Sequence, residues 1–181
     1  GEGFGEPSTI KRGSRLAGHG KDVHESLLHV PLIVKHPDQE KAHIIDEPAT
    51  LTRFPEVIKS ALEGEREGFV PDGPVVASSH GLDEPSIALA EEYCGGRSLY
   101  DGVSKAIYES TDGGIVKYET WEDQSSTVRL VDAKTSYRTD TSDGGRVAEM
   151  FGDLTDVGVR DEGDGFDDVD GTTRERLKEL G

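Results

Sequence analysis

Three β-prone stretches lie close together between residues 104 and 138, and they constrain the fold more than any other feature of the sequence. They span Lys105 to Tyr108, Ile115 to Trp121 and Thr127 to Val131. The tripeptide Asp112-Gly113-Gly114 separates the first two and is typical of a tight hairpin turn. Strands joined by such short turns run antiparallel, so we predict an antiparallel meander in this part of the chain.

The preceding region combines a strand pattern with a helix pattern. Val30-Pro31-Leu32-Ile33-Val34 is a continuous apolar run, typical of a strand that is buried on both faces. Apolar residues spaced by three and four predict an amphipathic helix from Leu51 to Leu62, with Thr50 or Thr52 as its cap and Pro55 in its first turn. Together with the meander, these patterns indicate a mixed α/β fold.

The remaining elements are shorter. The stretch from Gly1 to Gly20 is rich in glycine and has no apolar periodicity, so we predict a loop that needs unusual backbone angles or that approaches a ligand closely, and that is a candidate active-site loop. From Asp153 to Thr172 the chain is acidic, and we expect it to be disordered or loosely tethered. The other predicted elements are a strand at Val75 to Ala77, a helix at Ser86 to Tyr93, a helical turn at Arg146 to Phe151 and a closing helix at Thr173 to Leu180.

Acidic residues outnumber basic ones by 37 to 20, which gives a net charge of −17. This excess excludes a broad electrostatic surface for nucleic acid or for anionic membranes. It is tolerable where concentrated salt screens the charges, as in an extreme halophile. The alternative is an ordinary acidic protein with a disordered tail. Eleven acids and two arginines between Asp140 and Asp170 give that segment a net charge of −9. The remaining net charge of −8 lies outside this segment, so the tail alone does not account for the acidic excess.

The sequence contains neither a membrane span nor a disulfide pattern. No apolar run approaches the roughly 20 residues that a membrane helix needs. A single cysteine, Cys94, excludes an internal disulfide framework and any zinc site built from several cysteines. Because the chain opens at Gly1 and its only methionine is Met150, we expect it to be part of a longer protein. The lack of a signal-like segment then leaves the compartment open, with a lean towards the cytoplasm.

Three histidines, His19, His24 and His29, recur every five residues. Metal capture from one face of a helix needs a spacing of four, so the pair His24 and His29 does not form a zinc-protease motif. Without a family context, each of the three is interpreted as a surface or packing histidine.

Two pieces of sequence change that interpretation. The chain opens Gly-Glu-Gly-Phe-Gly-Glu, and residues 18–34 read Gly-His-Gly-Lys-Asp-Val-His-Glu-Ser-Leu-Leu-His-Val-Pro-Leu-Ile-Val. In order and spacing they resemble a segment of sulfatases and related hydrolases of the alkaline-phosphatase superfamily, in particular haloarchaeal members. That segment runs Asp-His-Gly-Glu, a glycine-rich loop, Gly-His-Gly or Gly-Lys-Gly, an aromatic-Glu pair and Val-Pro-Leu-Ile. The resemblance is strong over residues 1–63 and covers the rest only in general shape.

The resemblance implies an α/β fold of the alkaline-phosphatase-like sulfatase type, of which this chain is the carboxy-terminal part. Residues 1–98 are then the end of the catalytic domain. Residues 99–152 form a small antiparallel β-sheet plus helix subdomain, and residues 153–181 form an acidic tail with a short closing helix.

The resemblance also implies metal-dependent hydrolysis of a small-molecule or saccharide sulfate ester, with no nucleic-acid or membrane partner. A divalent metal, calcium or a similar ion, is expected in the full-length enzyme. Its Asp-His ligands would precede Gly1, so this chain alone is expected to hold no metal. The nucleophile, a formylglycine made from Cys-x-Pro-Ser-Arg, is not expected here either, because Cys94-Gly95-Gly96-Arg97 lacks that motif. The chain alone is therefore expected to be inactive.

Among the residues of this chain, the resemblance makes His19 a catalytic and substrate-binding candidate. A cationic donor is needed at this position because charge develops on the ester oxygens and the leaving alkoxide. Lys21 is a second candidate for contact with the anion. The chain departs from the family pattern at His24, His29 and Arg53, which stand in place of an aromatic residue, an arginine and an aspartate. Cleavage of phosphate or phosphonate esters, or a non-catalytic acidic binding module, are therefore the alternatives.

Overall fold

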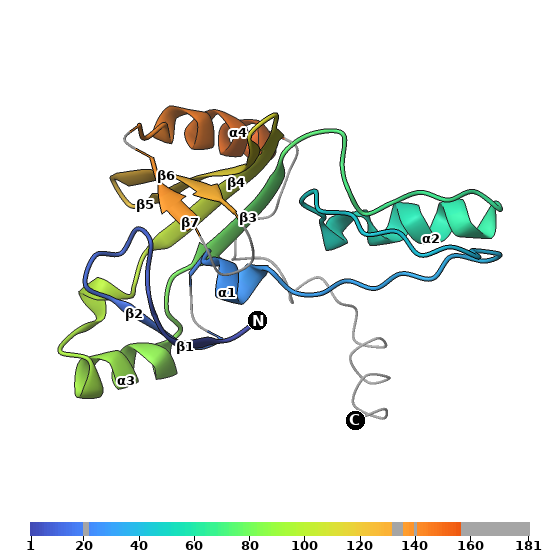
Figure 1. The fold of residues 1–181 in the computed structure, drawn as a ribbon. Coiled ribbons are helices and arrows are strands. Elements are labelled where there is room, and N and C mark those ends of the chain that lie inside the picture. Colours follow the sequence, from blue (N-terminus) through green and yellow to red (C-terminus); the bar gives the residue numbers. More distant parts are fainter. Residues whose placement is uncertain (20–21, 132–135, 140, 157–181) are drawn as a thin grey trace, which may run out of the picture. The chain divides into compact units, whose positions relative to one another are not determined.

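The computed structural model describes residues 1–19, 22–131, 136–139 and 141–156, with side chains described as far as residue 152. Its elements, in chain order, are β1 (Gly3–Pro7), β2 (Arg15–Gly18), α1 (Glu25–Leu28), a 3₁₀ turn (Leu51–Arg53), α2 (Phe54–Leu62), β3 (Val75–His80), α3 (Glu84–Tyr93), a second 3₁₀ turn (Arg97–Leu99), β4 (Val103–Thr111), β5 (Gly114–Trp121), β6 (Gln124–Leu130), β7 (Ser136–Arg138) and α4 (Gly144–Asp156) (Figure 1). The chain divides into two compact units, Gly1–Val147 and Ala148–Gly181, so α4 begins in the first unit and continues in the second. The fold is mixed α/β.

The larger sheet has five strands in the order β3-β4-β5-β6-β7, and every neighbouring pair is antiparallel. The predicted meander is confirmed as β4, β5 and β6. Thr111 pairs with Gly114 across the turn that the Asp-Gly-Gly sequence predicted. β3 precedes residue 99, so the antiparallel sheet draws its first strand from the part of the chain that was expected to end the catalytic domain.

One face of this sheet carries the core of the first unit. Val23, Ala106 and Tyr108 are buried together, and partly buried apolar residues pack against them: Val75, Ala77, Ile115 and Leu130. Strand side chains alternate between faces, so Ile107, which is fully buried, lies on the opposite face from Ala106 and Tyr108. The sheet is therefore covered on both faces.

The predicted helix over Leu51 to Leu62 is confirmed as a 3₁₀ turn followed by α2. The Thr50 side chain accepts a hydrogen bond from the backbone N–H of Thr52, which identifies Thr50 as the cap. Pro55 lies in the first turn of α2, where its missing N–H is not needed. The helix predicted at Ser86 to Tyr93 is also confirmed, as α3, and it begins two residues earlier because Asp83 caps it.

The prediction of a loop over Gly1 to Gly20 is wrong for residues 3–7 and 15–18, because β1 and β2 form an antiparallel pair there. Gly3 explains the misreading. A Cβ on Gly3 would lie 2.6 Å from Cβ of Leu16, so glycine serves the close approach of two strands rather than a flexible loop.

The prediction of a buried strand over Val30–Val34 is also wrong. These residues lie outside every described strand, and Ile33 is 94% exposed. A continuous apolar run forms a strand only where neighbouring strands pair with it and other layers cover its faces. None of the strands in the described part of the chain supplies that partner.

At the carboxy-terminal end, α4 is longer than the predicted turn at Arg146 to Phe151 and continues to Asp156. The expectation of disorder from residue 153 onwards is therefore wrong for residues 153–156. The rest of the acidic tail and the predicted closing helix lie outside the described residues. No helix of the described part is long and apolar enough to cross a membrane.

Candidate functional site

His19 directly follows β2 and is exposed. Because Gly3 of β1 pairs with Gly18 of β2, the strand pair brings His19 back beside Gly1. The imidazole Nδ1 lies 3.2 Å from the carbonyl oxygen of Gly1. A carbonyl oxygen can only accept, so this contact requires the proton on Nδ1 and leaves Nε2 out of the bond.

Gly1 is itself fixed against the short helix α1. A Cβ built on Gly1 would overlap the carbonyl oxygens of Ser26 and Leu27. These atoms belong to the backbone and cannot move aside as a flexible side chain would. Glycine is therefore required at this position for the observed contact.

Lys21, the second candidate for contact with an anion, lies outside the described residues, as does Gly20. The stretch resumes at Asp22, which is buried. Of the two candidates, the structure therefore locates His19 alone.

The residues that depart from the family pattern have structural roles of their own. His24 caps α1, since its Nδ1 accepts from the backbone N–H of Ser26 at 3.1 Å. Arg53 donates to the carbonyl oxygen of Val70 at 2.7 Å and to Oε2 of Glu67 at 2.9 Å. Through these bonds Arg53 connects the start of α2 to the segment that follows the helix.

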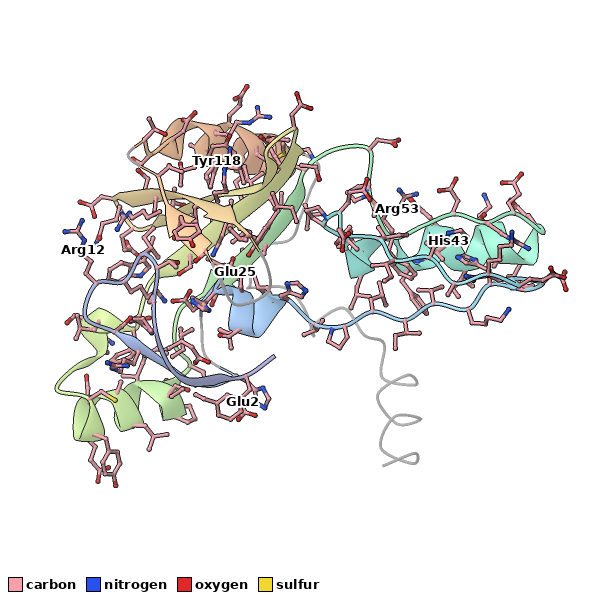
Figure 2. The ribbon with its side chains drawn as sticks, viewed as in Figure 1. Glu2, Arg12, Glu25, His43, Arg53 and Tyr118 are labelled. Atoms are coloured by element: carbon pink, nitrogen blue, oxygen red, sulfur yellow. The ribbon has the colours of Figure 1, made fainter. Side chains whose placement is uncertain are left out.

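Beneath α1 lies a buried charged cluster that the sequence analysis did not anticipate. Nζ of Lys117, in β5, lies 3.0 Å from Oε1 of Glu25 and 2.7 Å from Oε2 of Glu119. These are ion pairs by distance, although neither has the angles of a hydrogen bond. The Tyr108 hydroxyl donates to Oε1 of Glu25 at 3.1 Å, and the Thr9 hydroxyl donates to Oε2 of Glu119 at 3.0 Å. Glu25 lies on the side of α1 that faces the sheet (Figure 2).

The environment of this cluster shifts the pKa values of two of its members. Burial alone would lower the pKa of Lys117, but its interactions with Tyr108, Glu119 and Glu25 outweigh burial and raise that pKa above its ordinary value. Burial raises the pKa of Tyr108 as well. Lys117 is therefore an ammonium ion and Tyr108 a neutral phenol under ordinary conditions. With Glu25 and Glu119 ionised, the cluster carries a formal charge of −1.

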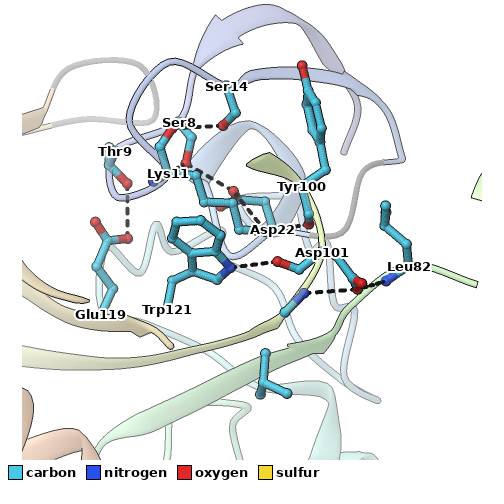
Figure 3. Close-up of polar contacts among 12 residues, drawn as sticks. Ser8, Thr9, Lys11, Ser14, Asp22, Leu82, Tyr100, Asp101, Glu119 and Trp121 are labelled. Atoms are coloured by element: carbon cyan, nitrogen blue, oxygen red, sulfur yellow. Dashed lines mark hydrogen bonds and ion pairs between the residues drawn. The ribbon is translucent and has the colours of Figure 1, made fainter. Parts of the chain in front are cut away.

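A second buried pair holds the loop between β1 and β2 (Figure 3). Nζ of Lys11 lies 3.8 Å from Oδ2 of Asp22, to which the Ser8 hydroxyl also donates at 3.0 Å. Nζ of Lys11 donates to the carbonyl oxygen of Tyr100 at 3.2 Å and lies 5.7 Å from the centre of a Trp121 ring. Burial lowers the pKa of Lys11, against the opposing effect of Asp22. The pair fixes the loop that leads into β2 and His19.

The described residues do not fit a metal centre, because they contain no group of three or more His, Cys, Asp or Glu side chains placed to hold an ion. His19, His24 and His29 accordingly share no ligand set.

Sequence reasoning missed the buried cluster for an identifiable reason. Lys117 and Glu119 alternate with Val116 and Tyr118 along β5, which is the usual pattern of a strand with one wet face. In this structure α1 and the segment before it cover that face. The opposite charges of Lys117 and Glu25 are compatible with an ion pair. The two residues are far apart in the sequence, however, so no local pattern predicts that they meet.

No protein-family model, curated protein or solved structure matches the chain.

Proposed function

We propose that the chain is the carboxy-terminal part of a sulfatase-type hydrolase of the alkaline-phosphatase superfamily, and that His19 contacts the sulfate group of its substrate. The observation that carries the proposal is the ordered sequence from Gly1 to Val34, joined to one geometric fact. The β1–β2 pair holds an exposed imidazole against the carbonyl of Gly1.

This geometry matters because of where the family keeps its metal ligands. In the resembled segment, an Asp-His pair stands immediately before the glycine that corresponds to Gly1. A histidine whose Nδ1 is bonded to Gly1 would therefore lie next to that pair. In the resembled family, the residue that binds the ester oxygens is likewise expected to lie next to the metal ligands.

His19 is chemically suited to this role. As an imidazolium ion it can donate a charge-assisted hydrogen bond from Nε2 to a non-bridging oxygen of the ester. It can also release that proton to the leaving alkoxide as the ester bond breaks, so that the alcohol departs neutral. The overall reaction consumes one water and yields the alcohol and inorganic sulfate. By the resemblance, the metal ligands and the nucleophile would belong to other parts of the enzyme, so no other step is assigned to the residues of this chain.

The test uses the complete product of the gene, assayed in molar potassium chloride with an aryl sulfate and with the matching aryl phosphate. We expect hydrolysis of the sulfate, and we expect His19→Ala to lower kcat by roughly 10²- to 10⁴-fold, the range of a positioned proton donor. His80→Ala is the matched control, because His80 is exposed in β3 and bonds to Ser78.

Three outcomes would change the proposal. Cleavage of the phosphate ester alone would replace it with the phosphohydrolase alternative. Equal activity in the two histidine variants would remove His19 from the site. The absence of any hydrolysis, together with a gene that lacks Asp-His before Gly1 and lacks Cys-x-Pro-Ser-Arg, would favour the non-catalytic acidic binding module.

A further inference from the structure

We propose that Glu25, anchored by the buried Lys117, is the residue that positions His19. The contacts form a continuous chain from the centre of the five-stranded sheet to the exposed imidazole. The catalytic importance of these contacts rests on the proposed function, whereas the contacts themselves do not depend on it.

The first link is the anchor between the sheet and α1. Lys117 is fully buried in β5, and its ammonium lies 3.0 Å from Oε1 of Glu25, the first residue of α1. The Tyr108 hydroxyl, from β4, lies within hydrogen-bond distance of both that oxygen, at 3.1 Å, and the carbonyl oxygen of Val23, at 3.2 Å. A helix of four residues has little stability alone, so these buried contacts determine where α1 lies.

The second link is between α1 and Gly1. The carbonyl oxygens of Ser26 and Leu27 approach Gly1 so closely that a Cβ there would overlap them. A displacement of α1 towards Gly1 would therefore push Gly1 aside, and a displacement away from it would remove the surface against which Gly1 packs.

The third link is between Gly1 and His19. The 3.2 Å contact from Nδ1 to the Gly1 carbonyl selects one of the two neutral tautomers of His19. Nε2 is then an acceptor in the neutral ring, and it donates to an anion only when it also carries a proton, as in the imidazolium ion. The same logic governs metal-ligating histidines, whose second nitrogen is fixed by an outer partner.

Glu119 provides the matched comparison. It contacts the same ammonium, at 2.7 Å, and is fully buried, but its other bond goes to Thr9 in the β1–β2 loop. Removing either carboxylate takes one negative charge from Lys117. Of the two carboxylates only Glu25 belongs to α1, so only its removal takes away the ion pair between the sheet and α1.

The experiment measures the tautomer of His19 in the chain itself, labelled with ¹⁵N-histidine, by long-range proton–nitrogen spectra in molar potassium chloride. The pH is held at about 8.5, where an ordinary imidazole is neutral. We expect the wild-type chain and Glu119→Ala to show the proton on Nδ1. We expect Glu25→Ala to lose that signature and to give the tautomer ratio of the same chain unfolded in urea.

A second variant protects the test against misfolding. Gly1→Ala leaves the buried cluster intact but forces Gly1 away from α1, and we expect it also to lose the Nδ1–H signature. Dispersed amide signals in the spectra establish that each variant is folded. If Glu25→Ala does not fold, the tautomer of His19 in Gly1→Ala tests whether contact with α1 positions the imidazole. A signature that persists in the folded variants, or one that Glu119→Ala removes as completely, would overturn the proposal. Since no activity is measured, failure of the sulfatase proposal would leave this result unchanged.

Discussion

Nζ of Lys117 and Oε1 of Glu25 lie 3.0 Å apart in the interior of the first unit, joining the middle of a β-strand to the start of a four-residue helix. Charged groups are costly to bury unless they are paired. The pair therefore makes the position of α1 sensitive to any change in the charge of the cluster, and the predictions below begin from it.

Replacing Lys117 by Met is expected to lower the free energy of unfolding by about 3–5 kcal/mol, because two carboxylates would remain buried without their cation. Urea unfolding followed by circular dichroism measures the change. The triple variant Lys117→Met, Glu25→Gln, Glu119→Gln removes the stranded charges and should recover part of the loss. Lys59→Met, at an exposed position of α2, is the surface control and should change stability by less than about 0.5 kcal/mol. A loss for Lys117→Met no greater than that of the control would mean that the cluster is not buried.

Alkaline pH is expected to destabilise the fold. The pKa values of Lys117 and Tyr108 are both raised in the folded protein, so it retains two protons that the unfolded chain releases. Their contribution is fully present below about pH 10, where unfolded tyrosine and lysine begin to titrate, and it decreases as the pH rises further. The lowered pKa of Lys11 acts in the opposite direction and offsets part of this effect.

Urea midpoints measured between about pH 8 and pH 11 test this dependence. Tyr108→Phe removes one of the two retained protons, so its midpoint should fall less steeply than that of the wild type. A wild-type midpoint that stays level, or rises, over this interval would contradict the assignment.

The exposed apolar run predicts a contrast between two isoleucines. Ile107→Ala is expected to cost about 2–5 kcal/mol, because Ile107 is fully buried in β4 and its removal leaves a cavity. Ile33→Ala should change stability by less than about 0.5 kcal/mol, since Ile33 is 94% exposed. Chemical denaturation of the two variants in parallel provides the comparison. A comparable loss at Ile33 would show that the run is covered in solution.

The charge of −17 predicts a fold that depends on salt. Raising potassium chloride from about 0.1 M to 2 M shortens the screening length from about 10 Å to a few ångströms, so the thermal midpoint should rise as repulsion among the acids is screened. Sucrose at the same osmolality is the control, because it is excluded from protein surfaces but screens no charge. If sucrose raised the midpoint as far as the salt does, screening would not be the cause.

The sequence predicted well those elements whose signals are local. The strands β4 to β6 follow from their β-prone composition and the Asp112–Gly114 turn. The helix α2 follows from its apolar spacing and from the cap at Thr50 of the 3₁₀ turn that leads into it. In each case the deciding atoms lie within a few residues of one another, where periodicity and turn chemistry operate.

The errors arose where partners are distant in sequence. Val30–Val34 has the composition of a strand but has no strand beside it in the described part of the chain. Gly3 belongs to a strand although its neighbourhood reads as a loop, because the glycine is needed for the approach of Leu16. The pairing of Lys117 with Glu25 depends on how α1 packs on the sheet, which no local pattern encodes.

The same limit applies to the site. His19 was selected through a resemblance, and its contact with Gly1 depends on a strand pair that the sequence analysis did not predict. Neither Glu25 nor its partner Lys117 was predicted as a site residue from the sequence. The residue that positions a functional group was thus harder to find than the group itself.

The tight junction of Gly1 with α1 and His19 also bears on how the protein should be handled. Any peptide fused directly in front of Gly1 must leave the molecule beside the His19 imidazole, within reach of the same anions and metal ions. A polyhistidine purification tag in that place would add further imidazole signals to the spectra. It would also place metal-binding side chains beside His19. A tag at the carboxy-terminal end, or removal of an amino-terminal tag before measurement, keeps the signals of His19 free of overlap with those of the tag.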